Sequence, residues 1–443
     1  MTINPNFSQV EVDEQITNLT LFDIRLPEKR FFFLENSDIF EDFGIPPMRP
    51  FFSRKIGLDD ERNPIPILYG ARLSIGLMNL QSKYTDKHLS QNYTAMAFHQ
   101  QVFSRSIIKG YIHNRQAINS PVPEYNRNLG LEFLYRSTDG RFQTFAGYAK
   151  SFSPEIDSKD YFYNTGIGYD NRNISVYTNL AGLGENYKAD IGYIRGQEYY
   201  DASRDTSINI GFNHWFSRFA YTLYPENNQK IISHEFQVRN IYDADTTFSM
   251  LSNDTELSYT IKFVNTSQFQ LSFNHNMVNL LFPFTFINNE PLPADLYAYD
   301  QVELRYESDQ RKLFTLQGNI LYGSFYNGTR AQYRFGIRYR IQPWMNFFVN
   351  FEQNGLKFPD PYGKDKLFLI SSRIEFNFST SLFWTTFLQY NTQYDNFNIN
   401  SRIQWRFQPM SDLYIVYTDN YAVEFWGPKN RALVVKLNYW FNP

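Results

Sequence analysis

The segment from Arg330 to Ile341 alternates between two kinds of side chain along its whole length, reading Arg-Ala-Gln-Tyr-Arg-Phe-Gly-Ile-Arg-Tyr-Arg-Ile. Successive side chains on a β-strand point to opposite faces of the sheet. The odd-numbered positions, all apolar, would therefore share one face, and the arginines would share the other. Because the same pattern recurs with large aromatic residues in segment after segment, it is typical of a transmembrane β-barrel.

Composition supports strands rather than helices as the membrane-crossing elements. Aromatic residues make up 19% of the 443 residues, yet the mean hydropathy of −0.47 is that of a polar protein. The apolar residues must therefore be spread singly, as alternation requires. The longest apolar runs, such as Phe31 to Leu34 and Leu280 to Phe282, are far shorter than the roughly 18 residues that a membrane helix needs.

The chain divides into residues 1–64 and residues 65–443. The first part lacks sustained alternation, contains the Pro-rich break from Ile45 to Pro50, and carries seven Lys or Arg against twelve Asp or Glu, a net charge of −5. The second part has a net charge of +2, since the whole chain has −3. We predict an all-β, antiparallel barrel of about 20–22 strands from residue 65 onward, with a strand at Lys188 to Ile194 and an extracellular loop between Phe282 and Leu296.

A barrel of about 22 strands is wide enough to need a plug, and the acidic leader could fill its lumen. The apolar run of Phe31, Phe32, Phe33 and Leu34 would anchor it to the inner wall. A periplasmic or disordered tail is an equally open interpretation of residues 1–64. If the leader is a plug, its removal would leave a folded barrel that conducts more.

Charged and amide side chains on the inner face are the candidate functional residues. Mixed charges on such a wall shape the field across a pore and select solutes; alternatively, they only form salt bridges with one another and with an acidic plug. The candidate lumen-lining residues are Gln332, Arg334, Arg338, Arg340, Arg373, Arg402, Arg406, Glu303, Arg305 and Glu307.

Nothing in the sequence predicts an enzyme, a metal site or a cofactor. The six histidines show no ligand spacing, and with no cysteine in the chain thiolate sites and disulfides are excluded. A Ser nucleophile with a His base assembles in space, so sequence order alone neither supports nor excludes it. Asp59, Asp60 and Glu61 lack the alternate ligands and glycine of a calcium loop, and a solvated turn is the favoured interpretation.

The chain resembles a known family over essentially its whole length. The run from Asn4 to Asp13, the segment from Leu26 to Phe40 and the stretch from Ile65 to Leu73 are similar to the opening of a Gram-negative outer-membrane β-barrel family, and the ending from Lys436 to Asn442 fits as well. That family carries a domain of unknown function, usually behind a carbohydrate-binding family-9-like domain. The chain departs from it at Phe31, where members tend to have Pro, and in lacking that sugar-binding domain.

These observations predict an outer-membrane channel or transport barrel for small hydrophilic solutes in the Gram-negative cell envelope, with outer-membrane lipid as its surroundings. A link to saccharides comes from the family association only. The alternative is a non-transporting structural or assembly barrel with other envelope proteins as partners. A net charge of −3 argues against nucleic acid. Export to the outer membrane requires a signal peptide, and the start at Met1 shows none, so we expect a mature or truncated form.

Overall fold

The computed structural model describes residues 2–3, 13–34, 37–58, 65–73, 76–85, 87–201, 203–287, 290–422 and 427–440. Its main element is one 22-stranded sheet. The strands of this sheet are β1 (Thr2–Ile3), β3 (Ile67–Leu73), β4 (Leu77–Ser82), β5 (Gln91–Val102), β6 (Ser106–Ala117), β7 (Tyr125–Arg136), β8 (Phe142–Phe152), β9 (Tyr161–Asp170), β10 (Ile174–Leu183), β14 (Phe212–Leu223), β15 (Ile231–Asp245), β16 (Met250–Phe263), β17 (Gln268–Asn279), β18 (Leu296–Glu307), β19 (Phe314–Phe325), β20 (Gly328–Ile341), β21 (Met345–Lys357), β22 (Lys364–Asn377), β23 (Leu382–Asn391), β24 (Asn396–Gln408), β25 (Ser411–Ala422) and β26 (Gly427–Asn438).

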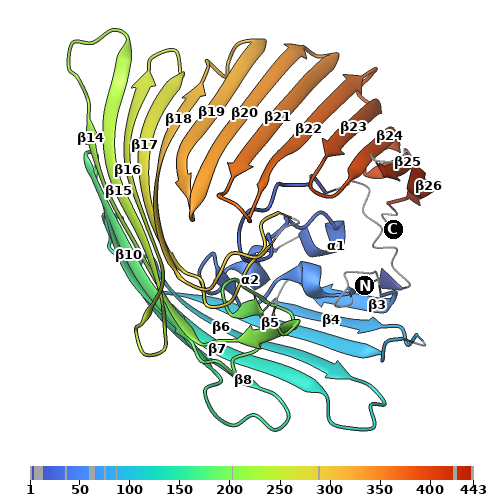
Figure 1. The fold of residues 1–443 in the computed structure, drawn as a ribbon. Helices are drawn as coiled ribbons and strands as arrows, with labels where there is room; N and C mark the ends of the chain where they lie inside the picture. The colour runs from blue at the N-terminus through green and yellow to red at the C-terminus, as the bar shows by residue number, and fades with distance from the viewer. Residues whose placement is uncertain are drawn as a thin grey trace.

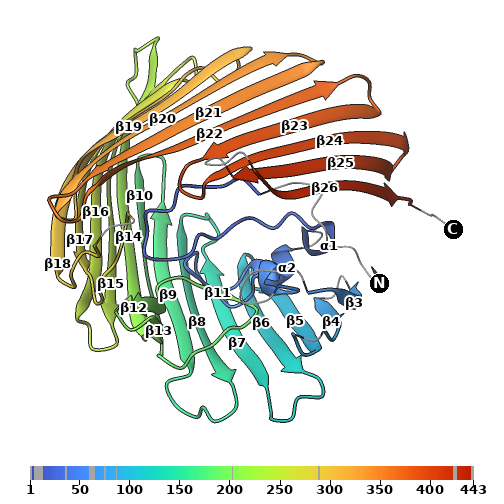
Figure 2. The same ribbon diagram turned by 45° about the vertical axis from the view of Figure 1, so that its right-hand side comes forward.

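Every pair of neighbouring strands is antiparallel, from β1 and β3 through β10 and β14 to β26. The sheet curls around a central space, as Figures 1 and 2 show. The predicted antiparallel barrel and its strand number are confirmed. No helix in the described part of the chain is long and apolar enough to cross a membrane.

The two rims of the barrel differ in the length of their connections. The strand bounds place ten hairpins at one rim, which we call the turn rim, with connections of two to seven residues, such as 342–344 between β20 and β21 and 224–230 between β14 and β15. The opposite rim, the loop rim, carries the two longest connections, 184–211 and 280–295. Short turns on one side and long loops on the other are usual for outer-membrane barrels.

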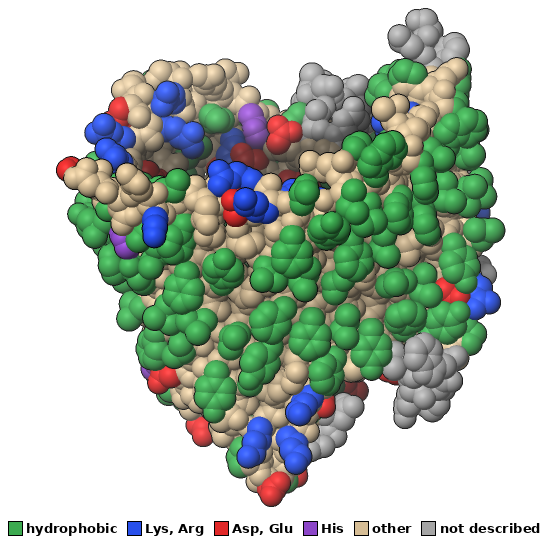
Figure 3. Space-filling view, turned by 90° about the horizontal axis from the view of Figure 1, so that it is seen from above, with side chains coloured by type: hydrophobic (Ala, Val, Ile, Leu, Met, Phe, Trp, Pro, Cys, Tyr) green, Lys and Arg blue, Asp and Glu red, His purple; other side chains and the backbone are tan. Residues whose placement is uncertain are grey.

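The outer face of the wall is apolar. Tyr333, Phe335 and Ile337 of β20 are exposed, whereas Gln332, which directly precedes Tyr333, is buried on the inner side. Apolar side chains cover the outer wall visible in Figure 3 as a band, with charged side chains gathered toward its upper and lower edges. This is the arrangement that a membrane-spanning barrel requires.

Replacing a residue of this band with a charged one should be costly. We expect Phe335→Arg to lower the free energy of unfolding by ~2–4 kcal/mol, because it moves a guanidinium into the hydrocarbon region. Arg334→Gln, on the opposite face, should cost only about 1 kcal/mol, since Glu352 keeps hydrogen bonds from Gln332 and Asn354. Urea unfolding in lipid vesicles measures both, and equal costs would mean that the two faces are assigned wrongly.

Residues 37–58 of the leader pack against the inner side of the wall. This segment contains α2 (Asp38–Glu41), β2 (Met48–Arg49) and the 3₁₀ turn η1 (Ser53–Lys55). Phe43 and Ile56 are fully buried in a hydrophobic cluster that they share with wall residues such as Leu80 of β4 and Leu183 of β10. Gly44 has a φ of +70°, and a Cβ there would lie 2.2 Å from the carbonyl oxygen of Met48, so this turn needs glycine. The leader therefore shares a core with one half of the barrel.

The long connection 184–211 also enters the lumen. It carries β11 (Tyr193–Ile194), which pairs with β2, and the hairpin of β12 (Glu198–Asp201) and β13 (Thr206–Asn209). The predicted wall strand at Lys188 to Ile194 is therefore wrong: its residue Ile191 is buried in the leader's core. Alternation alone cannot distinguish a wall strand from a short strand that pairs inside the barrel.

Connection 280–295 folds over the lumen rather than extending outward. Leu280 and Leu292 belong to a second hydrophobic cluster with Phe325 and Leu356, and Leu19 of the leader packs against it. Figure 1 shows this segment, in yellow, crossing the interior. The loop rim is thus partly covered from within.

Candidate functional site

A cavity of about 670 Å³ lies between the leader and the inner faces of β18 to β23, and we call it the luminal cavity. Its lining carries both charges together with several amides, which suits hydrophilic solutes. The lining residues that bear charged or amide side chains are Asp13, Glu14, Gln15, Lys29, Arg305, Glu307, Gln317, Asn319, Arg334, Asn350, Glu352, Arg373 and Gln389.

Charges on the wall of the cavity are paired, either across neighbouring strands or along one strand. Arg334 of β20 places its Nε 3.0 Å from a carboxylate oxygen of Glu352 on β21. Arg305 donates to Glu303 on its own strand at 3.0 Å, and Asn319 donates to the same carboxylate. The wall therefore presents paired charges and amides rather than a strong field of one sign.

The leader closes the other side of the cavity with residues 13–29, which we call the strap. Gln389 of β23 accepts a hydrogen bond from the backbone N–H of Gln15 at 3.0 Å and donates to its carbonyl at 3.1 Å. The side-chain amide of Gln393 likewise accepts a hydrogen bond from the backbone N–H of Asn18 at 3.1 Å and donates to the carbonyl of Asn18 at 2.8 Å. Arg373 adds an ion pair of 2.5 Å with Glu14. Two amide clamps and one ion pair thus hold the strap against β22 and β23.

The structure brings four of the candidate lumen-lining residues into the luminal cavity: Arg305, Glu307, Arg334 and Arg373. Glu303 lies beside them as the partner of Arg305, and Gln332 is buried behind them, donating to Glu352. Of the arginines expected to pair with the acidic leader, Arg373 does so through Glu14.

Four others lie outside the cavity lining. Arg338 sits 5.0 Å from the ring centroid of Phe348. Arg406 pairs with Asp412 at 3.2 Å. Arg340 donates to two carbonyls of the turn between β18 and β19, so it braces the turn rim rather than lining the lumen. Arg402 projects from β24 and is not part of the lining.

The predicted anchor of the plug, Phe31 to Leu34, forms the single turn α1. Phe33 is buried and Phe32 packs against the same cluster, but Leu34 is 43% exposed. The side chain of Phe31 lies outside the described residues, as do Asp59, Asp60, Glu61, Phe441 and the resemblance-bearing residues 4–12. The same cluster also contains Phe40, Phe43 and Phe51 from the later part of the leader, which alternation could not indicate because this segment is irregular.

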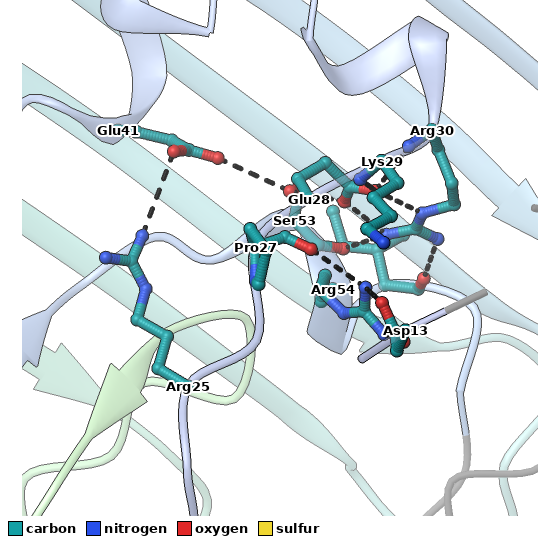
Figure 4. A network of polar contacts seen from close by, with 10 residues as sticks. Asp13, Arg25, Pro27, Glu28, Lys29, Arg30, Glu41, Ser53 and Arg54 are labelled. Atoms are coloured by element: carbon teal, nitrogen blue, oxygen red, sulfur yellow. Dashed lines mark hydrogen bonds and ion pairs between the residues drawn. The ribbon is translucent and has the colours of Figure 1, made fainter. Parts of the chain in front are cut away.

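A buried ionic network holds the leader in shape, as Figure 4 shows. Arg30 binds Glu28 at 2.8 Å and donates to the carbonyls of Ser53 and Ile56, tying the strap to η1. The Ser53 hydroxyl donates to Glu28 at 2.6 Å. Burial alone would raise the pKa of Glu28, but hydrogen bonds from Arg30 and its positive charge outweigh burial and hold that pKa below its ordinary value.

Glu41 shows the opposite balance. It lies 3.8 Å from Arg25, and the Ser53 hydroxyl is 3.4 Å away. Burial raises the pKa of Glu41 above its ordinary value, because these partners are too distant to compensate fully for lost hydration. The network thus stabilises the ionised form of Glu28 and disfavours the ionised form of Glu41.

His214, Asp243 and Ser252 lie close together but do not form a catalytic triad. His214 and Asp243 are hydrogen-bonded at 2.6 Å, but Ser252 donates to the Asp243 carboxylate rather than to the imidazole. A triad needs the hydroxyl on the second imidazole nitrogen. Among the described residues, no three His, Asp or Glu side chains are grouped closely enough to hold a metal ion.

Comparison with protein-family models finds a match at the beginning of the chain. Residues 1–65 match the model of a domain of unknown function, DUF5916. This agrees with the resemblance noted from the sequence, and the match brings no carbohydrate-binding domain with it. A search of curated proteins found no matching relative.

Solved structures with a similar shape include outer-membrane receptors. The siderophore receptor PirA from Acinetobacter baumannii is 11% identical, with a TM-score of 0.46 over 87% of this chain and 78% of the receptor. A mutant of the ferric enterobactin receptor PfeA from Pseudomonas aeruginosa, in complex with enterobactin, is 9% identical with a TM-score of 0.49, over 80% and 68% of the two chains. At this similarity nothing about their ligands carries over to this chain.

Proposed function

We propose that this chain is an outer-membrane transport barrel that passes small hydrophilic solutes through its lumen when the strap moves. The observation that carries the proposal is the luminal cavity, bounded on one side by a polar wall and on the other by a strap held through a few exchangeable polar contacts. The apolar outer band supports a membrane location, and the short connections of the turn rim support its placement on the periplasmic side.

The paired charges of the wall favour solutes without a strong net charge. Arg334 and Glu352 neutralise one another, as do Arg373 and Glu14. A solute entering the cavity would meet amide donors and acceptors from Gln317, among others, in place of water. This supports uncharged or zwitterionic hydrophilic solutes over anions or cations.

A non-transporting barrel that acts as a scaffold is the second candidate. The two hydrophobic clusters favour it, because the leader core and connection 280–295 close much of the lumen. The two proposals differ in what a loosened strap would do. In a transport barrel, loosening the strap opens a path; in a scaffold, the clusters keep the path closed.

Loosening both amide clamps is the decisive experiment. In Gln389→Leu with Gln393→Leu, four hydrogen bonds are lost, and at about 0.5–1.5 kcal/mol each we expect the strap to detach far more often. Planar-bilayer recordings should show open events at least about tenfold more frequent than in the unmodified protein. The matched control is Gln404→Leu on β24, whose amide bonds Asp412 and Tyr414 but not the strap.

Liposome swelling with uncharged, anionic and cationic solutes of equal size then tests selectivity. Faster swelling with the uncharged solute in the clamp variant supports the proposal. If protease digestion shows a released strap while conductance and swelling remain at the level of the Gln404→Leu control, the transport function is wrong and the scaffold is favoured.

A further inference from the structure

The two rims of the barrel carry opposite net charges. Among the described residues of the loop-rim connections, 13 Asp or Glu stand against six Lys or Arg, a net charge of −7. In the described turn-rim connections, six Lys or Arg stand against three Asp or Glu, a net charge of +3. The turn rim, which the proposal above places on the periplasmic side, therefore presents a basic surface beside the apolar band.

Three consecutive turns of this rim each carry one exposed arginine. Arg105, Arg141 and Arg172 lie in the connections from β5 to β6, from β7 to β8 and from β9 to β10, and we call them the arginine sector. Among the described residues, Arg105 and Arg172 have no ion-pair partner, and Arg141 lies 3.7 Å from Asp139. These three turns therefore have a net charge of +2, most of it not neutralised by the protein.

Local contacts position the two unpaired guanidiniums without neutralising them. A Cβ built on Gly140 would lie 2.7 Å from Nη1 of Arg105, so this guanidinium lies over the turn between β7 and β8. The guanidinium of Arg172 lies 4.9 Å from the ring centroid of Tyr224. Neither neighbour supplies a negative charge, and a guanidinium has five N–H donors. Both groups therefore keep donors for an external anion.

Tyrosines beside the arginine sector mark the level of the lipid headgroups. Tyr135, Tyr169 and Tyr224 lie at the turn-rim ends of β7, β9 and β14, and each is 38% exposed. Tyrosine is enriched at the membrane–water interface because its amphipathic ring sits at the depth of the headgroups. The turns that carry the arginine sector lie at these same strand ends. Their guanidiniums are therefore placed near the depth of lipid phosphates.

Phe103 adds an apolar contact next to the arginine sector. It is 82% exposed, more than any other large apolar side chain in the described part of the chain. Its φ is +55°, a region that bulky residues rarely adopt, so this turn holds a phenylalanine at a cost. Burial among acyl chains would stabilise an exposed phenylalanine, since it removes apolar surface from water. Arg105 follows two residues later, so an apolar and a phosphate contact would be adjacent.

We infer that the arginine sector binds the headgroup phosphates of anionic phospholipids in the adjacent leaflet, with Phe103 inserted at the boundary of the acyl chains. This inference rests on the membrane location proposed above. Arginine suits the task because its planar guanidinium can donate two parallel hydrogen bonds to one phosphate. An acidic protein would match the charge as well, but it would not account for tyrosines at headgroup depth or for the exposed Phe103.

Lipid retention by the detergent-folded protein tests the inference. Native mass spectrometry counts the molecules of phosphatidylglycerol, which is anionic, and of phosphatidylcholine, which is zwitterionic, that stay bound. The test variant combines Arg105→Gln, Arg141→Gln and Arg172→Gln. Each basic residue near an anionic lipid surface raises the affinity about fivefold. We therefore expect this variant to retain phosphatidylglycerol at least about tenfold less than the unmodified protein, with phosphatidylcholine unchanged.

Two further variants separate charge from apolar contact. The matched control combines Lys83→Gln, Lys159→Gln and Arg204→Gln, which removes three positive charges from the loop rim and should leave phosphatidylglycerol retention unchanged. Phe103→Asn keeps the turn, because asparagine tolerates a positive φ better than phenylalanine does. It should lower the retention of both lipids severalfold and by the same factor, since the lost contact is with acyl chains.

Three results would overturn the inference. Equal phosphatidylglycerol retention in the arginine variant and the loop-rim control would show that the sector is not a lipid site. Displacement of the lipid by soluble glycerol phosphate would assign the sector to a free phosphate compound. Unchanged lipid retention together with loss of a copurifying acidic protein would assign it to a protein partner. None of these readouts involves solute passage, so failure of the transport proposal and failure of this inference are distinguishable.

Discussion

Replacing Phe43 and Phe51 with Asp should detach the leader and open the lumen. Phe43 is fully buried and packs edge-on against Tyr111 of β6, and Phe51 packs against His113 of the same strand. Losing a buried Phe costs ~3–5 kcal/mol, and the introduced carboxylates would be buried without partners. We expect a several-fold rise in single-channel conductance and new protease sensitivity within residues 37–58.

Leu34→Asp is the matched control, since Leu34 belongs to the same leader but is exposed. Cleavage of the leader without any change in conductance would mean that other elements seal the lumen. Deleting residues 1–64 is a less informative experiment than the sequence suggested. The leader shares its core with wall residues such as Leu80 and Leu183, so deletion exposes an apolar inner wall and destabilises the barrel as well as opening it.

Neutralising Glu28 should destabilise the docked leader far more than neutralising Glu41. Glu28 and Arg30 form a buried pair, and Glu28→Gln removes the carboxylate charge from this pair, at a cost of up to ~3–5 kcal/mol. Glu41→Gln removes a carboxylate whose charge burial disfavours, so it should be neutral or slightly stabilising at pH 7. Protease resistance of the strap and chemical unfolding measure both effects.

The same pair of residues sets the expected response to acid. Because folding holds the pKa of Glu28 below its ordinary value of 4.5, its ionised form stabilises the docked leader at neutral pH. That contribution is lost as the pH falls below 4.5 and through the lowered pKa. Glu41, with a raised pKa, changes in the opposite sense and becomes less unfavourable as it is protonated.

We therefore expect the protease resistance of the strap to fall below about pH 4.5 in the unmodified protein and in Glu41→Gln. In Glu28→Gln it should be low already at pH 7 and change little on acidification. An acid response that is unchanged in Glu28→Gln would show that another carboxylate controls docking.

Several features of the wall were determined by the sequence alone. Alternation at Arg330 to Ile341 predicted the strand β20 and the face of each of its residues, because the period of a strand is fixed by backbone geometry and one face must be apolar in lipid. The number of strands followed from counting such segments. The interior position of Arg334 and Arg373 followed in the same way.

Only the tertiary structure decided which inward side chains meet. Arg373 and Glu14 are 359 positions apart in the sequence, and Gln389 and Gln15, which are hydrogen-bonded, are separated by a similar distance along the chain. No local sequence pattern links the members of either pair. Gln389 was detectable as an inward residue of an alternating strand, but its role as a clamp depends on where the strap lies.

The leader shows the same limit. On β5 and β6 the inward residues Ala95 and Tyr111 are apolar, so both faces of these strands carry apolar side chains. Alternation therefore could not show that this half of the wall is a packing surface for Phe43. Burial and backbone pairing are properties of neighbours brought together by folding, and the order of residues along one strand does not contain them.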